Sequence, residues 1–419
     1  MHSENDLKII LDKKGSRYYS KVSYPLRFGR FTQIDTRDYI FCFDLNNRIK
    51  IIQSKNRKLH NLNEWLKLTV SNEWIYYSAA GYKGVRSFIG EYYLPCFSYS
   101  ANPLFKTYAY DKNLVNGILN DFSRFLDKPG NTQNLSQDVK NKFQLIVSAN
   151  HPAKLQKIAE EFHSITSGMI TVLPPDSRHV DYEVIPVNVA DGCLYNCDFC
   201  SVKTGKNFAV RDKMDILSQI QKLKRFYGPD INNCNSLFLG QHDALNAGAE
   251  IILYAAQKAY KEFDFKFSYM KNPMLFLFGS VDSLLNSREI LYKDLNDLPF
   301  YTYINIGMES ADQGALNMLK KPLNVKKVEM AFDRMLQINR EYMGIEVTAN
   351  FVMGGYLNDQ HYESILRLAK SRLQGPYGKG CFYFSPLENP GTTRYIQKKF
   401  IWLKNSSPVQ AYIYLIQRL

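Results

Sequence analysis

The sequence predicts an α/β protein in which a β-rich (α+β) N-terminal domain precedes a partial (β/α)6 barrel of the TIM type. From about residue 183, short apolar runs alternate with longer amphipathic stretches, a pattern typical of parallel βαβ units. The first 130 residues instead carry short β-like runs between turn residues, with little helical periodicity. A chain of 419 residues is long enough to bury the cores of both parts.

The N-terminal part is expected to be built mainly from short strands, such as 39–43 and 48–52. Its best helical segment is 114–122, the polar stretch 128–137 resembles a linker, and 152–166 has the spacing of an amphipathic helix. We therefore expect an aromatic-rich, basic β-rich domain at 1–140, a linker and helix at 141–182, the barrel at 183–385, and a basic extension at 386–419.

Six strands and the helices between them make up the expected barrel. The strands are expected near 183–189, 236–240, 265–270, 302–308, 345–353 and 380–385. The helices are expected near 212–226, 248–262, 281–294, 325–340 and 359–373. Because crossovers between parallel strands are right-handed and cover the sheet with helices, a partial barrel is the expected closure.

The composition is that of an ordinary globular protein, with 45% hydrophobic and 22% charged residues. No apolar run is long enough to span a bilayer, and the first residues lack a signal-peptide pattern, so we expect a cytoplasmic protein. Of the seven cysteines, Cys42, Cys96, Cys234 and Cys381 are scattered and are expected to be small buried residues. The other three fall within eight residues, a pattern that indicates a metal or a catalytic site.

The net charge of +13 is unevenly distributed along the chain. Residues 1–150 hold 22 Lys and Arg against 13 Asp and Glu, and residues 375–419 hold six against one. Such flanks favour an anionic partner, for example nucleic acid, an acidic peptide or a phosphorylated metabolite. A solvated basic surface explains the same charge, and no basic run is dense enough to decide between the two.

The clustered cysteines, Cys193, Cys197 and Cys200, directly follow the first expected barrel strand. Three thiolates on one loop can bind three irons of a 4Fe-4S cluster and leave the fourth iron without a protein ligand. A structural zinc site is the alternative, but zinc normally takes four protein ligands, and the sequence nearby supplies no fourth Cys or His.

With Phe199 just before the third cysteine, this C-x3-C-x2-C loop resembles that of the radical S-adenosylmethionine (SAM) superfamily, and the resemblance covers about 183–385. It implies an enzyme whose cluster cleaves SAM reductively to a 5′-deoxyadenosyl radical, which abstracts hydrogen from a substrate. It also implies an electron donor such as flavodoxin or ferredoxin. Over the whole chain the sequence is most similar to uncharacterised radical SAM proteins, which leaves the substrate open.

The resemblance also implies cofactor-binding roles for residues at the ends of the second and third strands. Gly240 and Asp243 occupy the place of the turn that takes the methionine amino group of SAM in relatives. Ser268 is the candidate at the end of the third strand, with a plain strand-end hydroxyl as the alternative. His242 either faces the substrate or is a hydrogen-bonded structural histidine.

The end of the fourth strand, Gly307-Met-Glu309-Ser310, is similar to an element of the subgroup that includes coproporphyrinogen oxidases and Elongator-type enzymes. That similarity implies that Glu309 contacts SAM and that Lys321 pairs with its carboxylate, although Lys321 also fits a solvated helix end. On the fifth strand, Asn350 matches the position that binds the ribose hydroxyls in relatives.

A function from another class remains open at this point, namely a non-catalytic module that binds nucleic acid or protein and keeps a structural metal. Such a module has no need of polar residues at the strand ends, so these residues favour the enzyme.

Overall fold

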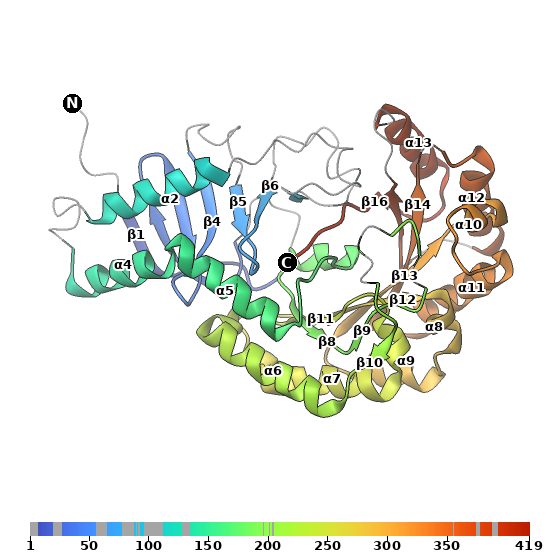
Figure 1. The fold of residues 1–419 in the computed structure, drawn as a ribbon, viewed down its shortest axis with the longest axis horizontal. Coiled ribbons are helices and arrows are strands. Elements are labelled where there is room, and N and C mark those ends of the chain that lie inside the picture. Colours follow the sequence, from blue (N-terminus) through green and yellow to red (C-terminus); the bar gives the residue numbers. More distant parts are fainter. Residues whose placement is uncertain are drawn as a thin grey trace.

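The computed structural model describes residues 7–19, 27–55, 65–77, 88, 90, 93–95, 112–127, 135–195, 197–200, 202, 205–354, 356–373, 378–387 and 393–419. Two seven-stranded sheets dominate these residues (Figure 1). The antiparallel sheet comes first in the chain, and the parallel sheet follows with helices around its outer side. This is the predicted combination of a β-rich N-terminal part with an α/β barrel-like part.

The antiparallel sheet is a meander in which each strand pairs with the next along the chain. Its strands are β1 (Lys8–Lys14), β2 (Arg30–Asp35), β3 (Tyr39–Phe43), β4 (Ile49–Ser54), β5 (Trp65–Leu68), β6 (Trp74–Tyr77) and β7 (Tyr93–Pro95). Helix α2 (Lys112–Asp127) covers one face, where the Phe122 ring stacks on that of Phe41 with 4.2 Å between centroids. The strands expected at 39–43 and 48–52 and the helix expected at 114–122 are confirmed.

Helices α4 (Gln137–Ala149) and α5 (Pro152–Ile165) lead from this sheet toward the parallel one, and α5 confirms the helix expected at 152–166. Asn150, between them, accepts a hydrogen bond from the Ile49 backbone N–H at 2.7 Å and donates to the Asn47 carbonyl at 2.8 Å. This side chain therefore fixes the helix pair to the start of β4. Most of the expected linker, like Cys96, lies outside the described residues.

The parallel sheet has the order β16-β15-β14-β13-β12-β11-β8. Its strands are β8 (Ile185–Asn188), β11 (Ser236–Gly240), β12 (Met274–Ser280), β13 (Tyr301–Glu309), β14 (Ile345–Met353), β15 (Phe382–Pro386) and β16 (Ala411–Ile413). A small ribbon, β9 (Ala190–Asp191) with β10 (Ala209–Val210), follows β8. The strands of the parallel sheet are apolar along most of their length because both faces are covered.

Helices that alternate with these strands lie along the outer side of the sheet (Figure 1). They are α6 (Lys213–Tyr227), α7 (Ala249–Glu262), α8 (Val281–Asn286), α9 (Glu289–Asp297), α10 (Gln313–Met318), α11 (Val325–Glu341), α12 (Asp359–Arg372) and α13 (Thr393–Ser406). Short 3-10 turns are η2 (Pro175–Val180), η3 (Gly228–Asn233), η4 (Ala244–Ala247) and η5 (Phe265–Phe267).

The structure corrects the third expected strand. The segment 265–270 is not a strand but contains η5, and the strand in that place of the sheet is β12, the continuous apolar run that follows. Ser268 therefore lies before the strand, where its hydroxyl donates to the Asn232 carbonyl at 3.0 Å. The single helix expected at 281–294 is two helices, and β16 adds a seventh strand to the six expected.

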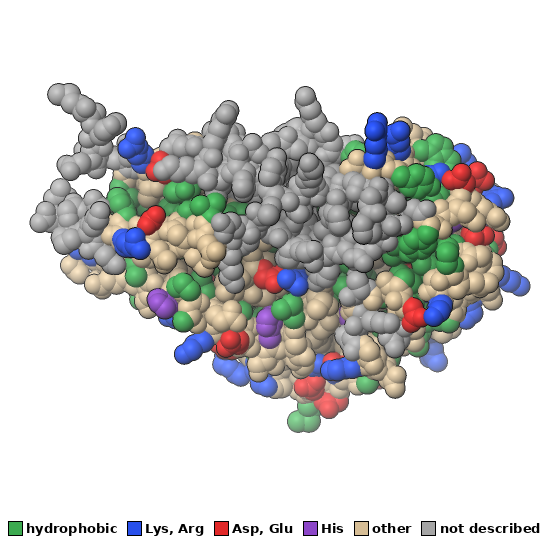
Figure 2. Space-filling view, turned by 45° about the horizontal axis from the view of Figure 1, so that its top comes forward, with side chains coloured by type: hydrophobic (Ala, Val, Ile, Leu, Met, Phe, Trp, Pro, Cys, Tyr) green, Lys and Arg blue, Asp and Glu red, His purple; other side chains and the backbone are tan. Residues whose placement is uncertain are grey.

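The described surface carries mixed charge on the face drawn in Figure 2, where Lys and Arg side chains are interspersed with Asp and Glu. In the part of the chain that the structure describes, no helix is long and apolar enough to cross a membrane. Cys42, Cys234 and Cys381 are free and buried, as expected for small core residues.

Candidate functional site

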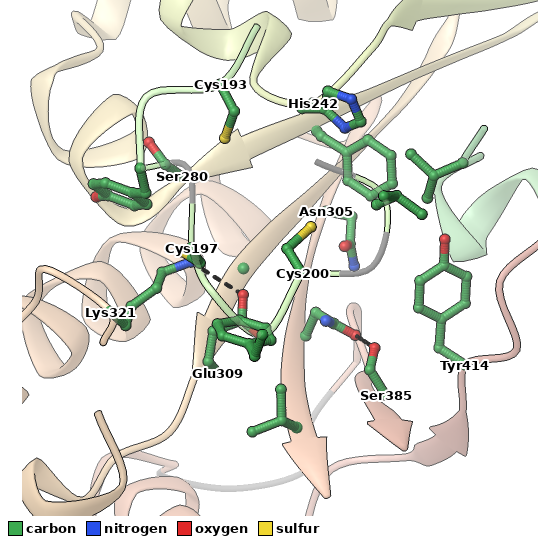
Figure 3. A pocket seen from close by; sticks show the side chains of 18 of the residues that line it. Cys193, Cys197, Cys200, His242, Ser280, Asn305, Glu309, Lys321, Ser385 and Tyr414 are labelled. Carbon is green, nitrogen blue, oxygen red and sulfur yellow. Dashed lines mark hydrogen bonds and ion pairs between the residues drawn. The ribbon is translucent and has the colours of Figure 1, made fainter. Parts of the chain in front are cut away.

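A pocket of about 500 Å³ lies at the carboxyl ends of the parallel strands (Figure 3). The loop after β8 and β9 runs along it with Cys193, Cys197 and Cys200, and all described lining residues lie at or after Val172 in the chain. This is the edge of a parallel β/α sheet at which ligands and catalytic groups gather.

The cysteine loop is held in place by a tight crossing. Gly192 has a φ of +74°, and a Cβ there would lie 2.2 Å from the Asn207 carbonyl oxygen, so only glycine fits. Beyond it, Cys197 is 7% exposed, while Cys193 and Cys200 are half-buried at the pocket. Burial raises the pKa of Cys197 to about 11 and also raises that of Cys200, so without a bound metal these thiols keep their protons.

Glu309 ends β13 with its side chain buried beside the cysteine loop, and its Oε1 accepts a hydrogen bond from Lys321 Nζ at 3.1 Å. It has a φ of +63°, a strained conformation for a residue with a side chain. Gly307 makes room, because a Cβ there would lie 2.7 Å from Glu309 Oε1. The other carboxylate oxygen, Oε2, is buried and has no partner among the described residues.

Neighbouring lysines after α10 differ sharply in environment. The Lys321 side chain is 6% exposed and points to Glu309, whereas that of Lys320 is 73% exposed and pairs with Asp198 at 2.7 Å. Burial by itself lowers the pKa of Lys321, but the Glu309 carboxylate outweighs burial and raises it. Lys321 is thus a buried cation at the pocket. The solvated position that the sequence also allowed for Lys321 is instead that of Lys320.

Asp243 supplies a second buried carboxylate. Its Oδ1 accepts from the Ser280 backbone N–H and from the Ser283 hydroxyl, both at 2.9 Å, at the start of α8. Its Oδ2 is buried with no partner in the described part of the chain, and burial raises the pKa of this carboxyl. Asp243 and Glu309 therefore each bring one unsatisfied oxygen to the pocket region, an arrangement that calls for a donor from a bound group.

The remaining predicted residues fall into two groups. Asn350 and Phe199 line the pocket, and Asn350 Oδ1 accepts from the Ser385 hydroxyl at 3.0 Å. Gly240 does not line it but ends β11, where a Cβ would lie 2.7 Å from Asn188 Oδ1. Ser268 lies at the opposite end of the sheet, so the structure does not bring it to the site.

The sequence left the role of His242 open between two alternatives and did not single out Tyr195. His242 lies at the pocket, burial lowers its pKa to about 4, and its Nε2 is buried without a partner among described groups. The Tyr195 hydroxyl donates to Asp282 at 2.7 Å, and its ring lies 4.8 Å from Lys321 Nζ. The position of Tyr195 between Cys193 and Cys197 in the sequence is the signal that could have identified it.

One protein family matches the barrel part of the chain. Residues 187–369 match the family profile described as the Radical SAM superfamily. No curated protein matches the chain.

Several solved structures align with the chain at low similarity. HydG, a maturase of the FeFe-hydrogenase, aligns with TM-score 0.37 and 12% identity over 73% of this chain and 66% of that chain. SuiB of Streptococcus suis bound to S-adenosylmethionine aligns with TM-score 0.37 and 10% identity over 90% and 72%. The cobalamin-dependent S-adenosylmethionine radical enzyme OxsB aligns with TM-score 0.35 and 14% identity over 56% of this chain, which spans only 33% of that enzyme.

Proposed function

Since residues 187–369 match the Radical SAM superfamily profile, we propose that the protein is an enzyme of that class and binds one 4Fe-4S cluster through Cys193, Cys197 and Cys200. The observation that carries the proposal is the position of three free thiols on one loop, facing the same pocket as a buried Glu309–Lys321 pair. When bound, the cluster and SAM supply a 5′-deoxyadenosyl radical that abstracts hydrogen from the substrate.

The three thiols share one loop at the pocket, which suits a cubane cluster that takes each thiolate on a different iron. Lys321 also lies near the thiols, and its charge favours the thiolate form of Cys197.

The buried polar groups that line the pocket suit the two ends of a zwitterionic amino acid. The unsatisfied oxygens of Asp243 and Glu309 accept hydrogen bonds from an ammonium group, and Lys321 donates to a carboxylate. Asn350, held by Ser385, lies further along the strand ends and serves as the partner for ribose hydroxyls. These assignments supply the methionine and ribose contacts that SAM requires, and the pocket shields them from bulk water.

The proposal is tested by anaerobic reconstitution followed by reduction with dithionite in the presence of SAM. We expect about four irons per chain with acid-labile sulfide. We also expect slow formation of 5′-deoxyadenosine and methionine, measured by liquid chromatography. A reconstituted protein that binds zinc but no iron, or that never forms 5′-deoxyadenosine, would contradict the proposal.

Replacing Lys321 with Met is expected to leave the iron content unchanged but to weaken SAM binding about tenfold or more. The substitution removes one charge-assisted contact, worth about 1.5–3 kcal/mol, while keeping the packing of the aliphatic chain. The dissociation constant is measured by equilibrium dialysis of the reconstituted protein. Lys213→Met is the matched control, because its side chain is exposed and pairs with Glu250 away from the pocket. Equal effects of the two substitutions would remove Lys321 from the SAM site.

A further inference from the structure

One wall of the pocket is formed by two extended segments that are far apart in the chain. After β16, residues 414–419 run beside residues 170–173, where the Leu173 N–H donates to the Gln417 carbonyl at 2.8 Å. The Leu419 N–H likewise donates to the Ile170 carbonyl at 3.3 Å. Arg418 forms an ion pair with Glu73 at 2.5 Å, which ties this segment to the antiparallel sheet. The wall is therefore anchored at several points.

Side chains alternate along these segments, so that Val172, Tyr414 and Ile416 all line the pocket. Together with Cys381 and Tyr383 they form a small apolar cluster apart from the main core. The Tyr414 hydroxyl donates to the Leu173 carbonyl at 2.5 Å, so its proton is already used within the wall. What this wall offers to a bound molecule is an aromatic ring and two branched aliphatic side chains.

The charged groups lie on the other side. Figure 3 shows Tyr414 across the pocket from Lys321 and Glu309. Among the described lining residues Lys321 is the one Lys or Arg, and Glu309 already binds it. His242 adds no positive charge near neutral pH, because burial lowers its pKa to about 4. Beside the wall, the described lining residues include no cation, so a phosphate or carboxylate there would lose its hydration without a lining cation to replace it, which is costly.

We propose that the wall formed by Val172, Tyr414 and Ile416 binds an uncharged apolar group of the substrate. The inference rests on the proposed function for the identity of the pocket, and it deepens that function by naming the substrate class. The basic charge of the flanking segments then has no part in recognising the reacting group, although it favoured an anionic partner in the sequence.

Three probes of nearly equal shape but different charge test this inference, namely benzamide, benzoate and benzamidine. Each is titrated by ligand-observed NMR into the oxidised, reconstituted protein with SAM at saturation. We expect benzamide to bind at least about tenfold more tightly than either ion, since the ions must be desolvated against an apolar wall. Tighter binding of benzoate, equal binding of all three, or no binding of benzamide at millimolar concentration would overturn the inference. Displacement of SAM by benzamide would assign the wall to the adenine of SAM and overturn it as well.

Two variants locate the probe. Val172→Thr keeps the shape of the side chain but places a hydroxyl on the wall, so benzamide binding is expected to weaken several-fold. Val210→Thr is the matched control, because Val210 is 46% exposed on β10 and does not line the pocket. Equal effects of the two would place the probe elsewhere. Iron content and 5′-deoxyadenosine formation are measured on the same samples, so a failure of the proposed function is seen separately from a failure of the wall.

Discussion

Replacing Cys193, Cys197 and Cys200 together with Ala is expected to lower the iron bound after anaerobic reconstitution from about four per chain to almost none. The three thiols share one loop and face one pocket, and no nearby cysteine in the described chain lines that pocket to replace them. Each single replacement is expected to lose most of the iron too, because two thiolates do not hold a cubane that already lacks one protein ligand. Iron and sulfide analysis, with the visible absorbance of the cluster, measures the loss.

Cys42, Cys234 and Cys381 provide matched controls for this prediction. All three are buried and free, and none lines the pocket, so Ala at any of them is expected to leave the iron content unchanged. A triple variant of the clustered cysteines that still binds a full complement of iron would remove the cluster from this loop. Loss of iron in the three control variants would instead indicate a general effect of unfolding.

The cysteine loop, Glu309 and Lys321 were singled out from sequence through the family resemblance, and the short spacings explain why the structure brings them together. The cysteines lie within eight residues, and the short helix α10 brings Lys321 back to Glu309 twelve positions later. In both cases local backbone geometry is enough to bring the groups together. The proposed subgroup with Elongator-type enzymes stays a prediction, since the family match is to the superfamily as a whole.

The third strand shows where pattern reasoning failed. The segment 265–270 alternates polar and apolar residues, which is typical of a strand exposed on one side. A central strand of a parallel sheet is covered on both faces and therefore has a continuous apolar run, which is what β12 contains. Ser268 was proposed as a site residue because it was expected at the end of this strand. The structure places it before β12 instead, away from the pocket.

The apolar wall was beyond sequence reasoning for a different reason. The hydrogen bond between Tyr414 and Leu173 joins residues 241 positions apart, and no local pattern indicates which distant segments meet. The run from Tyr412 to Ile416 is continuously apolar, but no strand was expected there. From their charge, the residues after 386 were expected to form a basic extension. The pairing of β16 with β15 is seen only in the structure.

A partly buried ion cluster joins the two sheets, and we expect its loss to have a large effect on stability. Glu183, just before β8, binds Lys67 of β5 at 2.6 Å and Lys50 of β4 at 3.1 Å. The Lys67 side chain is only 8% exposed, and it also donates to the Asp181 carbonyl at 2.6 Å. Burial by itself raises the pKa of Glu183, but the two ammonium groups outweigh it and lower this pKa to about 2.

Glu183→Gln is expected to lower the free energy of unfolding at pH 7 by about 2–3 kcal/mol, because it leaves two lysines in a partly buried site without their counterion. The carboxyl titrates near 4.3 in an unfolded chain, and its pKa in the folded protein is lower. The stabilisation is therefore complete above about pH 4.3 and is lost as the pH falls through the folded value near 2. Urea unfolding between pH 7 and pH 2 is expected to show the wild-type and variant curves converging at the acid end.

Glu250→Gln, at an exposed pair with Lys213, serves as the control and is expected to change the unfolding midpoint little. A constant difference between wild type and Glu183→Gln down to pH 2, or no difference at pH 7, would show that this cluster does not hold the two sheets together.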